Sequence, residues 1–393
     1  YDFANSGYTT VVLTAIFNTY FVGVIAAHAV GGRATLYWTL TMVAANAIVL
    51  LTAPVIGALA DFGAHKKRFL VITTSGCILF TAALATVGPD DLMWAVVLVI
   101  MATVMFSAGE NIIAAFLPEI APPNELGRVS GYGWALGYIG GLLVLAICLA
   151  YVSWAESRGQ GAAEYVPVTL LITAGMFALA TLPTFIWLKE RAQKHRLADG
   201  EHMLAVGFKR VYRTWKDAKR FRDLSRFLVA LTVYQSGIYT VIVLAAIYAQ
   251  KVMGFTTRDT ISMILVVNIT AAIGAFTFGQ LQDRLGSVRT LVLTLLLWIA
   301  ALLIVYIGES RSMFWLAANL IGLALGSSQS AGRALVGLFS PPGRSAEFFG
   351  LWGLAVKLAA IIGPLSYGLI TYISHGDHRL AILSTNVFFI VGL

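Results

Sequence analysis

The 393-residue sequence is 59% hydrophobic and only 12% charged, with a mean hydropathy of +0.81. About a quarter of the residues in a soluble protein are charged, so this composition excludes a chain whose surface faces mainly water. The formal net charge of +8 follows from membrane topology, described below, and requires no nucleic-acid partner.

Apolar runs separated by short polar breaks predict membrane-spanning helices, because about 20 apolar residues as a helix cross a bilayer. Twelve such runs are found, at residues 3–27, 36–60, 69–88, 92–117, 127–152, 166–188, 226–250, 258–282, 288–308, 312–336, 345–373 and 378–393. The expected fold is an all-α integral membrane protein embedded in a lipid bilayer. The sequence carries no metal-ligand cluster, nucleophile–base pair or cofactor motif, so we expect neither a cofactor nor an enzyme.

Lys and Arg residues are concentrated in alternate connections between these helices. The connections after helices two, four, six, eight and ten hold 20 of them, and the other connections hold six. Because positive charge marks the cytoplasmic side, both termini are expected in the cytoplasm of a monomeric, multi-pass protein of the bacterial inner (plasma) membrane. The longest connection, residues 189–225, predicts an amphipathic basic helix on the inner leaflet.

The segment "GALADFGAHKKR", which starts at Gly57, concentrates charge at the end of helix two and is repeated later in the chain. Its counterpart is "GQLQDRLGSVR" at the end of helix eight. Gly57 and Asp61 match Gly279 and Asp283 at an offset of 222, and Arg284 follows in the second copy.

Two further segments repeat in the same order. "APPNELGRVSG" from Ala121 aligns with "SPPGRSAEFFG" from Ser340 at an offset of 219, and "NSGYTTVV" from Asn5 resembles "QSGIYTVI" from Gln235 at an offset of 230. These offsets predict two pseudo-symmetric six-helix bundles, residues 1–188 and 226–393, joined by the linker 189–225. A parallel repeat of this kind places a transport site at the seam between its halves.

The "G-x-L-x-D-x-x-G" turn resembles the signature loop of the major facilitator superfamily, although in the first copy Gly63 falls one residue early. More narrowly, "YDFANSGYTTVVLTAIFNTYF", "FLPEIAPPNELGRVSGYGWALGYIGG" and "RFRDLSRFLVAL" resemble the vacuole-effluxer (autophagy-related permease) branch. This resemblance implies the major facilitator fold, alternating access and a solute site at the midplane. The fungal members of the branch are linked to amino-acid export. The chain departs from the branch at residues 235–237, which read Gln-Ser-Gly where Asn-Asp-Gly is expected.

The repeated aspartates are expected to face helix N-termini in the opposite half. Asp61 should meet the start of helix eleven and Asp283 the start of helix five, where a carboxylate gains about 0.3–1 kcal/mol. We therefore expect two conformational latches, formed by Gly57, Asp61, Gly279, Asp283 and Arg284. The alternative is that these are loop charges that only set topology, and we expect that role for residues 66–68.

Two charges of opposite sign, Glu110 and Lys357, lie well inside predicted spans, where charge usually marks function. The repeat places Gln329 opposite Glu110. Glu110 is the first candidate to bind a substrate ammonium or a coupling proton, and the alternative is a structural ion pair with Lys357 or Arg333. Lys357 would attract a carboxylate or neutralise Glu110.

Polar residues on helices one and seven are the remaining candidates for the substrate site. Asn5 and Asn18 on helix one, and Gln235 with Tyr239 on helix seven, are expected to face the central cavity. Other polar side chains of helix one are expected to bond back to their own backbone.

Together these features predict a secondary active transporter for a small polar or zwitterionic, amino-acid-like solute. It would work by alternating access, in uptake or efflux, with protons as the coupling ion in symport or antiport. Two alternatives remain open: an exporter of amphipathic or lipidic compounds, for which the aromatic content would suit the cargo, and a non-transporting membrane receptor of the same fold.

Overall fold

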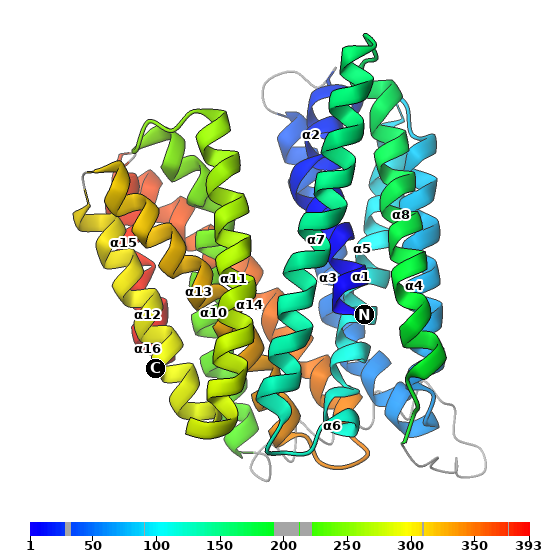
Figure 1. The fold of residues 1–393 in the computed structure, drawn as a ribbon, viewed down its shortest axis with the longest axis vertical. Coiled ribbons are helices and arrows are strands. Elements are labelled where there is room, and N and C mark those ends of the chain that lie inside the picture. Colours follow the sequence, from blue (N-terminus) through cyan, green and yellow to red (C-terminus); the bar gives the residue numbers. More distant parts are fainter. Residues whose placement is uncertain (28–32, 90, 192–211, 213–221, 309, 376) are drawn as a thin grey trace.

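The computed structural model describes residues 1–27, 33–89, 91–191, 212, 222–308, 310–375 and 377–393. Its helices run roughly along one long axis and form two groups (Figure 1). The first group contains α1 (Asp2–Tyr8), α2 (Phe17–Tyr20), α3 (Arg33–Gly63), α4 (Lys66–Ala83), α5 (Leu92–Ala114), α6 (Leu117–Ile120), α7 (Leu126–Ser157) and α8 (Ala162–Trp187). The second contains α10 (Arg222–Lys251), α11 (Thr257–Leu285), α12 (Ser287–Ile307), α13 (Arg311–Phe339), α14 (Ser345–Ile373), α15 (His378–Ser384) and α16 (Asn386–Gly392).

The described helices confirm a multi-pass membrane protein. Ten helical segments are long and apolar enough to cross a bilayer. The 29-residue α13 is not among them, and α15 with α16 forms a shorter apolar helix, His378–Gly392. The exact number of twelve spans therefore stays a prediction. Most of the linker, including the segment predicted to be amphipathic, lies outside the described residues.

Each group of helices packs around large buried aromatic side chains of its own. In the first, Tyr8 of α1 packs on Phe106 of α5 with ring centroids 5.1 Å apart. In the second, Trp298 of α12 stacks on Phe389 of α16, also at 5.1 Å. The two groups are called the N bundle and the C bundle below.

Glycines allow the two bundles to approach at one end. Helix α3 packs on α14 and α7 packs on α11, in both cases across the seam. A Cβ atom on Gly57 would collide with the carbonyl oxygen of Ala346, and one on Gly131 with the carbonyl oxygen of Ala275. Small residues permit such close backbone contact between membrane helices. We call this end, which carries the α3–α4 turn, α6 and the α13–α14 turn, the latch end.

At the other end the ribbons of the N and C bundles diverge (Figure 1). Leu149 on α7 is 41% exposed and Ile261 on α11 is 49% exposed, although both helices pack tightly on each other at the latch end. The bundles therefore meet mainly through their latch-end halves.

Candidate functional site

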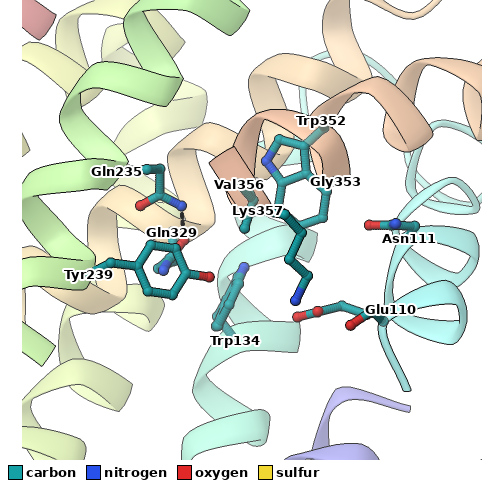
Figure 2. Close-up of a pocket in the computed structure, with 11 residues that line it drawn as sticks. Glu110, Asn111, Trp134, Gln235, Tyr239, Gln329, Trp352, Gly353, Val356 and Lys357 are labelled. Carbon is teal, nitrogen blue, oxygen red and sulfur yellow. Dashed lines mark hydrogen bonds between the residues drawn. The ribbon is translucent and has the colours of Figure 1, made fainter. Parts of the chain in front are cut away.

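A cavity lies on the seam between the two bundles (Figure 2). It has a volume of about 30 Å³, which is room for about two water molecules. Its walls come from α5, α7, α10, α13 and α14. The lining residues are Ser107, Glu110, Asn111, Trp134, Gln235, Tyr239, Gln329, Trp352, Gly353, Val356 and Lys357. Five of the seven residues expected to bind substrate or protons are among them.

The Lys357 ammonium points toward the Glu110 carboxylate across this cavity (Figure 2). Glu110 comes from α5 of the N bundle and Lys357 from α14 of the C bundle. No direct ion pair joins the two side chains in the part of the chain that the structure describes. The cavity thus presents one negative and one positive group, each from a different bundle.

Several buried polar atoms on the cavity wall have no hydrogen-bond partner among the described residues. They are the Ser107 hydroxyl, the Trp134 indole nitrogen and Oε1 of Gln235. Gln235 Nε2 donates a hydrogen bond to Gln329 Oε1 at 2.9 Å. Since buried polar groups are nearly always satisfied, this wall is suited to a polar occupant.

The expectation that Asn5 and Asn18 line the cavity is wrong. Neither is among its lining residues. Asn18 donates to the carbonyl of Leu13 at 3.3 Å, five residues back, and π-helical segments at Thr9–Ala15 and Phe21–Ile25 change the register of this helix. Ser6 and Thr10, which lie between them, face the glycines of α7 and bond back to their own backbone, as expected.

Asp61 makes the contact expected at the start of α14. Its Oδ2 accepts a hydrogen bond from the Glu347 backbone N–H at 2.7 Å, and the side chain is almost fully buried. The Lys66 ammonium lies 3.4 Å from Oδ1. A carboxylate at a helix N-terminus is stabilised by the N–H groups and dipole there.

Asp283 makes the matching contact at the start of α7. Its two carboxylate oxygens accept hydrogen bonds from the backbone N–H groups of Gly127, at 2.9 Å, and Arg128, at 3.0 Å. Gly279, one turn earlier, lies directly against Gly131. The Arg284 side chain is exposed and has no ion-pair partner in the described part of the chain. Both aspartates thus bridge the bundles at the latch end, whereas Arg284 does not.

Comparison with known families identifies the chain. The sequence profile described as "Vacuole effluxer Atg22 like" matches residues 34–393. The chain belongs to the Atg22-like vacuole effluxer family. It is therefore an MFS-type transporter rather than an enzyme.

Relatives of this Atg22-like transporter occur in bacteria and fungi. It is 27% identical over 402 residues to an "Uncharacterized MFS-type transporter YxiO" of Bacillus subtilis, covering 100% of this chain and 91% of that protein. It is 26% identical to "Autophagy-related protein 22-1" of Neosartorya fischeri, over 62% of this chain and 43% of that protein. The match spans about half the length of the fungal relatives, so their activity is not transferred directly.

Solved structures confirm the major facilitator fold. The human organic anion transporter MFSD10 superposes with a TM-score of 0.74 at 14% identity, covering 96% of this chain and 87% of that one. The proton:xylose symporter XylE superposes with a TM-score of 0.74 at 12% identity, covering 100% of this chain and 92% of XylE. The transporter FucP in the outward conformation superposes with a TM-score of 0.71 at 14% identity, covering 99% of this chain and 96% of FucP. At these identities the likeness concerns the fold alone.

Lys66 of the Atg22-like transporter is not the loop charge that was expected. It is 1% exposed, and its ammonium contacts Asp61, Glu119 of α6 and the hydroxyl of Ser345. Ser345 is the first residue of α14. One lysine therefore ties the α3–α4 turn and α6 to the C bundle.

Arg333 also bridges the bundles, but not through Glu110. Its Nη1 lies 2.5 Å from Oδ2 of Asp2, and its guanidinium donates to the hydroxyl and carbonyl of Ser130. The guanidinium carbon sits 5.4 Å from the centre of the Trp134 ring. Among the described residues Arg333 thus pairs with Asp2, and no ion pair joins it to Glu110.

Sequence reasoning missed the two tryptophans of the cavity, Trp134 and Trp352. Tryptophan in membrane helices is usually assigned to the interface with water. Trp134 lies eight positions after the first residue of α7, and Trp352 lies seven positions after the first residue of α14. The 219-residue repeat places Trp134 opposite Gly353, another lining residue. The repeat could have indicated this site if it had been applied to all cavity positions.

Proposed function

We propose that this Atg22-like transporter moves a small zwitterionic, amino-acid-like solute by alternating access around the Glu110–Lys357 cavity. The observation that carries the proposal is the pair of opposite charges from opposite bundles, which face each other beside unpartnered hydrogen-bonding atoms. An amino acid carries the same two charges on adjacent groups.

Each charged group has a role in this proposal. Glu110 binds the substrate ammonium, and Lys357 binds the carboxylate together with the unpartnered indole N–H of Trp134. Without substrate, the two side chains balance each other's charge, which keeps the cost of burying them low. Glu110 is also the group that takes up the coupling proton.

The size of the cavity supports a moving rather than a rigid site. Even the smallest amino acid is larger than the two water molecules for which there is room. The bundles must therefore separate to admit substrate. In the proposed cycle the Asp61 and Asp283 contacts hold the latch end closed while the other end is open, and they break when the transporter opens at the latch end.

Positive charge supports the orientation of this cycle. Helix α4 begins at the latch end with three consecutive cations, at residues 66–68. We place the latch end in the cytoplasm of a bacterial inner membrane, with residues 1–188 and 226–393 as the two rocking units.

Counterflow in proteoliposomes tests the function. Vesicles that contain the purified protein and an internal pool of the common amino acids should accumulate external radiolabelled amino acid, and protein-free vesicles should not. Glu110→Gln and Lys357→Met should each strongly reduce exchange, whereas Glu156→Gln, at an exposed position of α7, should leave it unchanged. Absence of counterflow with every amino acid would contradict the proposal.

A further inference from the structure

Two glutamines on the C-bundle wall of the cavity form an amide pair with unused hydrogen-bonding capacity. Gln235 of α10 donates from Nε2 to Oε1 of Gln329 of α13 at 2.9 Å. Gln235 is 2% exposed, and its Oε1 has no hydrogen-bond partner among the described residues. No contact in the described part of the chain uses Nε2 of Gln329 either.

An amide carries one acceptor oxygen and one NH₂ donor group. A single hydrogen bond between two amides leaves one free oxygen and one free NH₂ group, and this holds if both amides are rotated by 180°. The pair therefore keeps one unused acceptor and one unused donor on the cavity wall.

The amide pair lies apart from the charged groups. In Figure 2, Gln235, Gln329 and Tyr239 lie on one side of the cavity, and Glu110 lies on the other beside Asn111. The Tyr239 hydroxyl points from the amide side toward the middle of the cavity. A zwitterion held by Glu110 and Lys357 would thus direct its side chain toward the two glutamines.

We propose that the Gln235–Gln329 pair binds the side chain of the substrate and selects amino acids with a hydroxyl or carboxamide side chain. This inference rests on the proposed function and adds the substrate class to it. A hydroxyl or a carboxamide both donates and accepts, so it matches the free oxygen and the free NH₂ group of the pair.

Selection against other side chains follows from the burial of Gln235. An aliphatic side chain would displace water from the pair and leave a buried oxygen without a partner, a penalty that corresponds to roughly 10- to 100-fold in affinity. Sites built to hydrogen-bond a substrate group reject the analogue that lacks it far better than apolar pockets reject an added hydroxyl.

Threonine and valine provide the test because they have nearly the same shape. Purified transporter in proteoliposomes is assayed by counterflow with radiolabelled L-threonine and L-valine, and with L-glutamine and L-leucine as a second pair. We expect the polar member of each pair to be favoured by at least about 10-fold. The change Gln235→Met should reduce this ratio to near one, mainly by weakening the binding of the polar member.

Gln250→Met is the matched control. Gln250 lies on the same helix, is exposed, and does not line the cavity, so the ratio should stay at the wild-type value. Equal exchange of threonine and valine by the wild-type protein would overturn the inference while leaving amino-acid transport intact. A wild-type ratio that persists in Gln235→Met would also overturn it. Absence of exchange with all four amino acids would remove the proposed function and this inference together.

Discussion

The change Asp61→Asn should release the latch between α3 and α14. Asp61 is 1% exposed and accepts the Glu347 N–H bond while it faces the equally buried Lys66. Asparagine keeps the shape of the side chain but removes the charge, so Lys66 loses one of its two anionic partners. Removal of one member of a buried ion pair costs about 3–5 kcal/mol. Taking the lower limit, about 3 kcal/mol, the equilibrium shifts toward the latch-open state by about 150-fold.

Asp283→Asn provides an internal comparison. Asp283 is partly exposed and accepts two backbone hydrogen bonds without a buried lysine beside it. The amide oxygen of asparagine can keep one of these bonds, so the loss is about 1 kcal/mol. That corresponds to about a five-fold shift. The two latches should therefore differ in strength although the repeat makes them look alike.

Cysteine reactivity measures the open population. Ala346→Cys places a small thiol at a position that is 1% exposed and lies against Gly57. Its rate of reaction with a membrane-impermeant maleimide should rise up to about 150-fold in Asp61→Asn and about five-fold in Asp283→Asn. The exposed substitution Asp223→Asn should have no effect. If Asp61→Asn reacts at the wild-type rate, or less than Asp283→Asn, the reasoning about the buried charge is wrong.

Three further predictions follow from the same contacts. Glu110→Gln should remove the pH dependence of the transport that remains. Uptake is measured between pH 5 and 8, roughly the range in which a carboxylate that couples protons would act. An unchanged pH profile would mean that Glu110 does not carry the coupling proton. Gly57→Ala should force α3 and α14 apart, because the added methyl meets the Ala346 carbonyl, and should lower the melting temperature in detergent; an unchanged melting temperature would show that the helices adjust freely. Lys66→Met should lower the free energy of unfolding by about 3–5 kcal/mol, because Glu119 and Asp61 lose their cation. A denaturant titration that gives a loss of less than about 1 kcal/mol would mean that Lys66 behaves as a solvated surface charge.

The sequence predicts those parts of the site that depend on local or repeated features. Length and hydropathy predict the membrane helices, since a bilayer imposes both. The repeat predicts that Gln329 lies opposite Glu110, and both line the cavity. The contacts of Asp61 and Asp283 follow from their place at helix ends in matching halves, because helix N-termini attract carboxylates whatever their sequence.

Features that arise from packing between distant segments could not be predicted in the same way. Lys66 reads as a solvated loop charge until Glu119, 53 residues away, and Ser345, 279 residues away, enclose it. The expectation that Asn18 faces the cavity assumes a regular helix. The π-helical segments break that regularity and leave a backbone carbonyl for its amide.

The most direct test of the account is a pair of distance measurements across the seam. Spin labels at Arg128 and Arg284 report the latch end, and labels at Leu149 and Ile261 report the other end, all at partly or fully exposed positions of α7 and α11. The background replaces the two native cysteines, which are buried, with alanine. The account predicts that a transported amino acid lengthens the first distance and shortens the second in the same fraction of molecules. Distances that stay fixed, or that lengthen together, would contradict alternating access around this cavity.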